Sequence, residues 1–208
     1  MNTTNEVTFW DDVYLSRPAA TGPRPNTRLT EVVASLSPGD ALDLGCGDGG
    51  DTLWLAGQGW HVTAADISAV AVERLTALAR SHGIGDRVTA VRYDLGRAFP
   101  HGEFDLICAH YLHTPFDLDR ATVLRAAAHA LRPGGRLLVV DHGSTAPWSW
   151  NQDPGARYPS PREVAADIDL DETAWTVERA DTPRRTATGP DGRTAEVTDH
   201  VLLLRRTA

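Results

Sequence analysis

An apolar strand that runs directly into a glycine-rich turn constrains the fold of this chain more than any other feature. Residues 41–44 read ALDL, residues 45–50 read GCGDGG, and a short helical segment follows over residues 51–56. A glycine turn between a strand and a helix lets a bound group approach backbone N–H donors closely. The turn also satisfies the spacing GxGxxG, and an acidic residue, Asp66, lies 21 residues after its first glycine, Gly45. The pattern therefore predicts a nucleotide-type ligand at the end of this strand.

Strands and helices alternate over the next hundred residues. Strand-sized apolar runs occupy residues 41–44, 61–66, 88–92, 104–109 and 136–141. Helical spacing predicts one helix that is capped by Ser68 and ends near Gly83, and a second helix over residues 117–131. Such alternation is typical of βαβ units, in which helices cover both faces of a parallel sheet.

The two ends of the chain depart from this pattern. An N-terminal helix carrying Trp10 is expected before a Pro-rich loop over residues 16–27. A Pro- and Trp-rich stretch follows Asp141, and the runs 175–180 and 196–206 predict a hairpin around a polar turn. We therefore expect an α/β fold: a Rossmann-like, doubly wound sheet of seven strands, mostly parallel, with a C-terminal antiparallel hairpin.

The composition excludes several chemistries. The 208 residues contain 20 arginines and no lysine, against 28 carboxylates, for a formal net charge of −8. Without lysine the chain cannot form a Schiff base or use a P-loop lysine, and an acidic protein is a poor ligand for nucleic acid or an anionic membrane. The apolar runs are too short to cross a bilayer. Cys46 and Cys108 lack the CxxC spacing of a zinc site and the N-terminus lacks a secretion signal, so we expect a cytoplasmic protein.

The charge around the glycine turn distinguishes between two classes of ligand. Asp43 precedes the turn, and Asp48 and Asp51 lie at its end. Carboxylates in these positions repel the pyrophosphate of a dinucleotide such as NAD, which the GxGxxG spacing alone would also suit. S-adenosylmethionine carries an ammonium and a sulfonium group in place of phosphates. The acidic turn therefore favours S-adenosylmethionine, and an NAD-dependent oxidoreductase is the alternative.

Five ordered segments carry a family resemblance: ALDLGCGDGG, AADIS, RYDL, FDLICAHYLH and LRPGGRLLVVDHG. Together they resemble the class I S-adenosylmethionine-dependent methyltransferases. With the FWDDVY opening, the layout is similar to small-molecule enzymes of the thiopurine and tellurite-resistance type. The resemblance implies a single methyltransferase domain over residues 1–208, with a lid or cap region at 1–35, a cofactor-binding core at 36–142, and a substrate loop and C-terminal hairpin at 143–208.

The resemblance also implies how this chain would bind the cofactor. The methionine portion would lie on Asp43 and the glycine loop, and Asp66 would accept hydrogen bonds from the ribose hydroxyls. Asp94, with the backbone of Leu95, would contact the adenine amine, and the end of the fourth strand would lie near the transferred methyl group. The predicted cofactor residues are Asp43, Gly45, Gly47, Gly49, Asp66, Ile67, Asp94, Leu95, Ala109 and Trp10. Trp10 is expected as part of a lid, and packing onto the core is the alternative for it.

Methyl transfer is an in-line displacement, and positioning of the reactants supplies most of its catalysis. A hydroxyl or protonated amine acceptor also needs a proton acceptor, whereas a thiolate, a neutral amine or a soft inorganic nucleophile needs none. Three histidines near strand ends are candidates: His113 first, His142 second, and His110. A structural, hydrogen-bonded role is the alternative for each. These histidines and Asp141 lack the HxxxH or HExxH spacing of a metal site, so no metal is expected.

Two further groups have two interpretations each. Trp148 and Trp150 either line an apolar substrate pocket or pack a loop onto the core. Arg17, Arg24 and Arg28 either pair with the methionine carboxylate or an acidic substrate, or are solvated. The sequence thus predicts methyl transfer from S-adenosylmethionine, giving S-adenosylhomocysteine, to a small-molecule acceptor. We expect a monomer or homodimer without nucleic-acid or membrane partners, and a non-catalytic S-adenosylmethionine-binding protein is a further alternative.

Overall fold

A computed structural model describes residues 3–22, 24–149, 152–153, 155–189 and 191–207. Within them the helices are α1 (Thr3–Leu15), α2 (Thr27–Val33), α3 (Gly50–Gly57), α4 (Ala69–Ser81), α5 (Arg120–His129) and α6 (Pro161–Ile168), with a 3-10 turn at Gly85–Arg87. The strands are β1 (Asp40–Leu44), β2 (His61–Asp66), β3 (Val88–Arg92), β4 (Phe104–His110), β5 (Leu131–His142), β6 (Trp175–Asp181), β7 (Arg184–Thr188) and β8 (Thr194–Arg206). No helix in the described part of the chain has the length and apolarity needed to cross a membrane.

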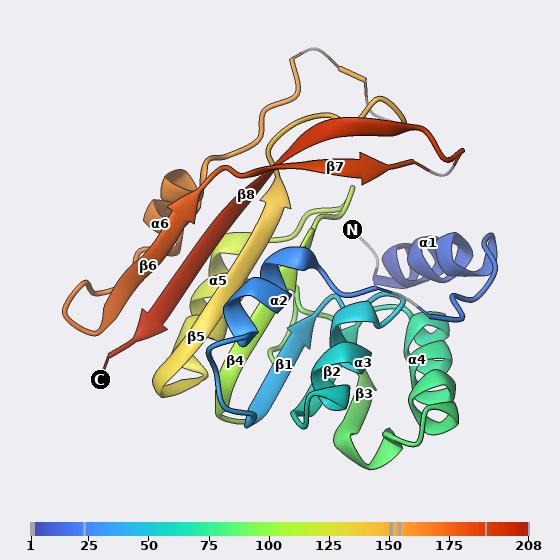
Figure 1. The fold of residues 1–208 in the computed structure, drawn as a ribbon, viewed down its shortest axis with the longest axis horizontal. Helices are drawn as coiled ribbons and strands as arrows, with labels where there is room; N and C mark the ends of the chain where they lie inside the picture. The colour runs from blue at the N-terminus through green and yellow to red at the C-terminus, as the bar shows by residue number, and fades with distance from the viewer. Residues whose placement is uncertain (1–2, 23, 150–151, 154, 190, 208) are drawn as a thin grey trace.

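The strands form one twisted sheet whose first five members are parallel (Figure 1). Its order is β3-β2-β1-β4-β5-β8-β6, and β7 pairs with the remaining part of β8. β8 is antiparallel to β5, β6 and β7. The doubly wound, mostly parallel α/β fold with an antiparallel C-terminal end is therefore confirmed. The chain order reverses between β1 and β4, which are neighbours in the sheet although β2 and β3 separate them in sequence.

Helices cover both faces of the sheet, as the near-continuous apolar strands require. Alternate residues of β4 show this: Leu106 and Cys108 pack with α2 and α3, whereas Ile107 and Ala109 pack with α5 and α6. α4 packs through Leu75 on the same face as α3. Helix α1 lies apart from these layers, beside α4 near the carboxyl ends of the strands (Figure 1). The carboxyl ends of the parallel strands are therefore covered by α1 and the loops, and not by the helices on the two faces.

Several elements differ from the sequence prediction. The helix expected over residues 117–131 begins at Arg120, because the Asp119 carboxylate accepts a hydrogen bond from the Thr122 amide and caps it. β5 begins at Leu131 rather than at residue 136, since Leu131 already pairs with Phe104 ahead of a bulge. Among the described residues the sheet has eight strands rather than seven. The additional strand is β7, which begins just before the segment 186–194 predicted as a polar turn.

The sequence pattern also does not predict α2 and α6. In α6, Ser160 and Glu163 form a capping box and Pro161 occupies the first turn. This is a recognised start signal that the polar surroundings obscured. α2 lies in the Pro-rich N-terminal region and is capped by the Asn26 side chain, which accepts a hydrogen bond from the Arg28 amide at 2.9 Å. Both helices are short, with seven and eight residues, so hydrophobic periodicity is a weak signal for them.

Ser68 is predicted to cap α4, and its hydroxyl oxygen indeed accepts a hydrogen bond from the Ala71 amide at 3.1 Å. The same fully buried hydroxyl donates to Asp11 Oδ1 of α1 at 2.6 Å. We expect Ser68→Ala to lower the free energy of unfolding by at least about 1 kcal/mol, because a buried cap is lost. Urea denaturation measures this, with Ser81→Ala in the exposed last turn of the same helix as control. Equal losses in the two variants would contradict the prediction.

Candidate active site

The carboxyl ends of the parallel strands open into a first cavity of about 440 Å³. It lies where the strand order reverses between β1 and β4, the place at which doubly wound sheets bind ligands. Its walls come from α1, the glycine turn, the ends of β2 and β3, and the loop after β4. Segments that are distant in the sequence therefore meet around one space.

The glycine turn has a backbone conformation that residues other than glycine rarely adopt. Gly45, Gly47 and Gly49 have φ angles of 72°, 52° and 81°. A Cβ atom on Gly47 would lie 3.0 Å from Tyr14 Oη, so the turn also permits a close approach of α1. Gly45 and Gly47 line the first cavity. Gly49 does not line it and packs against Leu75 of α4.

The end of β2 and the end of β3 form the next wall. Asp66 Oδ2 accepts a hydrogen bond from the Gly47 amide at 2.9 Å, and Oδ1 accepts one from the Ser68 amide at 2.9 Å. Burial raises the pKa of Asp66, while these two amide donors oppose the rise. Asp94 accepts a hydrogen bond from the Gly96 amide at 3.0 Å. Both carboxylates line the first cavity, and so do the other predicted residues of this wall, Ile67 and Leu95.

Two buried residues, Asp43 and Ala109, lie near the ends of β1 and β4. Asp43 does not line the first cavity and accepts a hydrogen bond from Thr52 Oγ1 at 2.7 Å. Burial and the neighbouring Asp51 raise the pKa of Asp43 well above its ordinary value. Ala109 is fully buried in the core. Asp43 therefore lies next to the glycine turn in sequence and Ala109 lies beside it through pairing with Leu44, but neither reaches the cavity surface.

His110 lines the first cavity, yet its imidazole is almost entirely buried. Its Nδ1 lies 2.7 Å from Asp51 Oδ2. Asp51 in turn accepts a hydrogen bond from the Asn26 amide at 2.6 Å. His110 Nε2 is buried and has no hydrogen-bond partner among the described residues. Since Asp51 engages one ring nitrogen, the other is available to a bound molecule.

Helix α1 forms the outer wall of the first cavity through Trp10 and Tyr14. Asp11 Oδ1 holds α1 on the start of α4 by accepting hydrogen bonds from Ser68 Oγ and, at 3.2 Å, from the Val70 amide. At the other end of α1, Arg74 Nη1 donates to the Tyr14 carbonyl at 2.6 Å. These contacts place Trp10 in the wall of the first cavity, and its role as a lid stays a prediction.

A second cavity of about 550 Å³ adjoins the first, and both are lined by Tyr111 and His113. His113 Nε2 lies 3.3 Å from Asp141 Oδ1. Arg120 Nη2 donates to both oxygens of the same carboxylate, at 2.6 and 2.7 Å. Burial opposes ionisation, but the hydrogen bond from His113 and the charge of Arg120 hold the pKa of Asp141 below its ordinary value. His113 thus stands between the two cavities with one nitrogen beside an ionised carboxylate.

The three candidate histidines meet at one edge of the sheet but occupy different positions. His142 lines the second cavity and not the first, and it stacks on the Tyr111 ring with centroids 4.3 Å apart. Burial and the nearby His113 lower the pKa of His142. His113 is about half exposed and His142 is also exposed, whereas His110 is largely buried. Of the three, His113 combines access to both cavities with a carboxylate partner.

The other candidates for substrate contact, each with two interpretations from the sequence, differ in their placement. Trp148 packs against Gly189 at the end of β7, and Trp150 lies outside the described residues. Arg28 is buried beside Asp199, away from both cavities. Arg17 lines the first cavity and pairs with Asp48 at 2.9 Å. Packing therefore accounts for Trp148, and an internal ion pair accounts for Arg28.

Sequence reasoning misses several residues of the second cavity. Arg120 lies in a predicted helix, but its contact with Asp141 arises only when α5 packs beside β5. Tyr158 Oη lies 2.7 Å from Thr145 Oγ1 within the irregular stretch before α6. Val164 and Ile168 form an apolar wall on α6, a helix that the sequence pattern does not predict. The capping box of α6 is the signal that could have located this wall.

The comparisons with known proteins concern mainly the core around the first cavity. Residues 41–135 match the family model of a methyltransferase domain. The 27-O-demethylrifamycin SV methyltransferase of Amycolatopsis mediterranei is 37% identical over 141 residues, which are 64% of this chain and 49% of that protein. The chain thus spans about half the length of the first curated relatives it matches.

A shorter relative and a solved structure extend the comparison. The "Probable cobalt-precorrin-6B C(15)-methyltransferase (decarboxylating)" of Methanothermobacter thermautotrophicus is 32% identical over 133 residues, covering 62% of this chain and 68% of that protein. The crystal structure of TehB from Haemophilus influenzae has the same fold, with a TM-score of 0.65 and 17% identity over 87% of this chain and 62% of that one. The glycine turn, the strand order and these similarities lead to one conclusion: the chain belongs to the class I S-adenosylmethionine-dependent methyltransferases.

Proposed function

We propose that this protein transfers the methyl group of S-adenosylmethionine, bound in the first cavity, to a hydroxyl group of a small molecule bound in the second. One observation carries the proposal: the two cavities meet at His113, whose imidazole lies beside the Asp141 carboxylate. A hydroxyl acceptor needs a group that removes its proton, and a histidine held by a carboxylate is suited to this task.

The residues of the first cavity fit S-adenosylmethionine. Gly45 and Gly47 line the cavity with backbone that carries no side chain, so a ligand can approach it closely. Each oxygen of Asp66 accepts one amide hydrogen bond and retains a lone pair for a ribose hydroxyl. Ile67 and Leu95 offer apolar surface for an adenine ring, and Asp94 lines the same cavity and pairs with exposed Arg97 at 3.3 Å. When bound, S-adenosylmethionine supplies an electrophilic methyl group on a sulfonium.

Other predicted cofactor residues act indirectly in this proposal. Asp43 accepts a hydrogen bond from Thr52 and so links the strand before the turn to the helix after it. Gly49 packs the turn onto α4. Residues 1–35 supply the lid, residues 36–142 the cofactor-binding core, and residues 143–208 part of the acceptor cavity. We also infer from the buried, unpartnered Nε2 of His110 that this histidine binds the methionine portion and is not the base.

The reaction uses the chain's own groups in three ways. Asp141 binds Nε2–H of His113 and fixes the ring so that Nδ1 is the free, basic nitrogen. Nδ1 accepts the proton of the acceptor's hydroxyl group. The oxygen of that hydroxyl forms the new bond to the methyl carbon, and the bond from this carbon to the sulfonium sulfur breaks. Arg120 keeps Asp141 ionised and in place. S-adenosylhomocysteine, the methylated product and a proton then leave the site.

The charged residues of the second cavity disfavour an anionic acceptor. Arg120 is neutralised by Asp141 and Arg157 by Glu163, and Asp167 adds a further carboxylate to the lining. The apolar residues Leu124, Val164 and Ile168 also line this cavity. A volume of about 550 Å³ is in the usual range for drug-sized ligands. We therefore infer an uncharged alcohol or phenol, rather than a nucleic acid, as partner.

Relatives support transfer to oxygen. The Amycolatopsis relative is named for a substrate that lacks an O-methyl group, and the Xylella fastidiosa relative, 42% identical over 113 residues, is named a ubiquinone biosynthesis O-methyltransferase. The test is a metabolite screen by mass spectrometry for compounds that gain one methyl group, together with calorimetry of S-adenosylmethionine, S-adenosylhomocysteine and NADH. Binding of NADH alone would contradict the proposed cofactor. Binding of S-adenosylmethionine without any methylated product would favour a non-catalytic binding protein.

Asp66→Asn removes the negative charge of the carboxylate to which we assign binding of the ribose hydroxyls, but keeps the size of the side chain. We expect the Kd of S-adenosylhomocysteine to rise about tenfold, which corresponds to about 1.4 kcal/mol of binding free energy. Isothermal titration calorimetry measures it. Asp86→Asn, in the 3-10 turn at the opposite edge of the sheet, is the matched control and should bind normally. An unchanged Kd in Asp66→Asn would argue against this role.

His113→Gln retains hydrogen bonding but removes the base. We expect kcat/KM for the hydroxyl acceptor to fall by about two to four orders of magnitude, as is usual for loss of a general base, while S-adenosylhomocysteine still binds. Initial rates with the acceptor found in the screen provide the measurement. His101→Gln lies in the exposed loop before β4 and serves as control. If His113→Gln retains full turnover, the proton acceptor is another group or the acceptor needs none.

A further inference from the structure

Tyr111 occupies an unusual position directly after β4. It is one of the two described residues other than glycine with a positive φ, which is 51°. Such a conformation costs on the order of 1 to 3 kcal/mol and persists where surrounding contacts enforce it. The Tyr111 amide donates to the Val140 carbonyl of β5 at 2.7 Å. This turn directs the aromatic ring to the junction of the two cavities, both of which it lines.

The ring of Tyr111 is held on its face and at its hydroxyl. His142 stacks on the face, with ring planes 22° apart. The hydroxyl donates to Asp199 Oδ1 at 3.0 Å and accepts from Arg185 Nη2 at 3.1 Å. Burial and the charge of Asp199 raise the pKa of Tyr111 to about 12, so the phenol stays neutral. Tyr111 is therefore a fixed wall and hydrogen-bond donor rather than a base.

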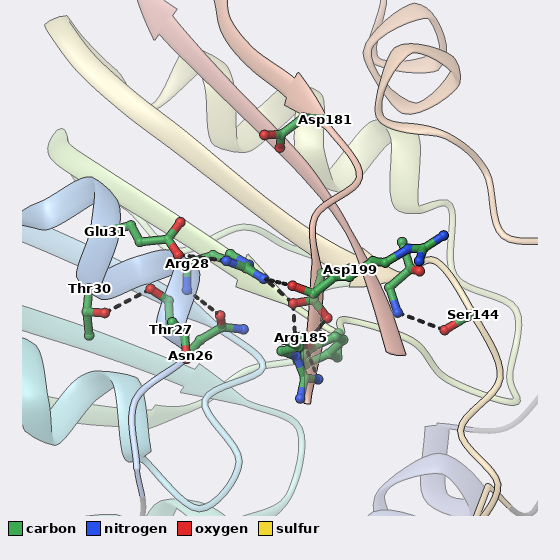
Figure 2. A network of polar contacts seen from close by, with 12 residues as sticks. Asn26, Thr27, Arg28, Thr30, Glu31, Ser144, Asp181, Arg185 and Asp199 are labelled. Carbon is green, nitrogen blue, oxygen red and sulfur yellow. Dashed lines mark hydrogen bonds and ion pairs between the residues drawn. The ribbon is translucent and has the colours of Figure 1, made fainter. Parts of the chain in front are cut away.

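Asp199 is the centre of a buried ionic network (Figure 2). Its side chain is 1% exposed. Arg185 Nε of β7 lies 2.9 Å from it and Arg28 Nε of α2 lies 3.3 Å from it, so that guanidinium groups approach the carboxylate from two elements. Arg28 also pairs with Glu31 at 2.6 Å. Removing one member of such a network would leave a buried charge without its partner, which is strongly unfavourable.

Burial of charge gives little net stability compared with an apolar cluster of the same size, because desolvation offsets the attraction between the ions. What the network supplies is a fixed direction for each group. Arg28, Arg185 and Asp199 all lie outside residues 41–135, the part that matches the methyltransferase domain. Even so, the network ends on a ring inside the proposed active site. The parts of the chain outside residues 41–135 are thus connected by direct hydrogen bonds to the junction of the cavities.

We propose that Asp199 and Arg185 are positioning residues that hold the Tyr111 ring as the partition between the first and second cavities. Through this ring, the C-terminal strands β7 and β8 set the alignment of the acceptor with the methyl donor. The kinetic part of this inference rests on the proposed function, whereas the holding of the ring does not. Misplacement of a reactant by about 1 Å can reduce the rate about 100-fold.

The holding of the ring can be tested without an acceptor. The sequence contains four tyrosines, so protein labelled with 13C at the tyrosine ring ε positions gives few signals, and Tyr111→Phe identifies that of Tyr111. We expect Asp199→Asn to shift and broaden the Tyr111 signal. Glu196→Gln, in an exposed ion pair on the same strand, is the matched control and should not change it. An unchanged Tyr111 signal in Asp199→Asn would overturn the inference.

A second variant guards against failure of Asp199→Asn to fold. Arg185 is partly exposed, and Arg185→Gln removes its charge from the carboxylate while Arg28 remains. It should also shift the Tyr111 signal. A native thermal transition in this variant with an unchanged Tyr111 signal would again overturn the inference.

The kinetic test separates positioning from a merely structural role. We expect Tyr111→Phe and Arg185→Gln to lower kcat with the acceptor from the screen about 100-fold, with an unchanged Kd for S-adenosylhomocysteine. Unchanged kcat in both would overturn the alignment of the acceptor by the ring. If the unaltered protein methylates no alcohol or phenol, the proposed function fails, and the Tyr111 signal alone still decides whether Asp199 and Arg185 hold the ring.

Discussion

Three hydrogen bonds fix the glycine turn to the end of β2, and the candidate site depends on them. The amides of Gly45 and Cys46 donate to the Ala65 carbonyl at 2.8 and 3.1 Å, and the Gly47 amide donates to Asp66. The positive φ angles of the turn make these contacts possible. They orient the Asp66 carboxylate, and the turn that they fix leads directly into α3. They also leave room for Tyr14, so that α1 can close over the cavity.

Elements determined by local interactions were predictable from the sequence. The bounds of β2 and β3 agree with prediction to the residue, because short apolar runs there are bounded by glycine and polar turns. The cap of α4 by Ser68 was equally clear. β7 was not, since its sequence RRTAT reads as polar and it is a strand only because β8 extends far enough to pair with it.

The candidate site was predictable only in part, for the same reason. Sheet topology alone brings His110, His113 and His142 to one edge, because β4 and β5 are parallel neighbours. Which histidine faces which cavity depends on side-chain direction after each strand, and the sequence does not encode that in a recognisable motif. Arg28 and Asp199 are 171 residues apart, and no pattern in the sequence connects them. Arg28 therefore looked like a candidate for substrate binding and is instead part of the internal support.

The two cavities draw on different stretches of the chain. The first uses α1, the glycine turn, the ends of β2 and β3 and the loop after β4, whereas the lining of the second begins in that loop at Tyr111 and runs to Ile168. In the proposed function, acceptor choice and donor binding are thus encoded by largely separate parts of the chain, which share the loop after β4. Under the proposed function, substitutions in α6 and in the stretch before it would alter which molecule is modified while the residues that hold the donor stay intact. Such a separation would make the fold adaptable to new acceptors over evolutionary time.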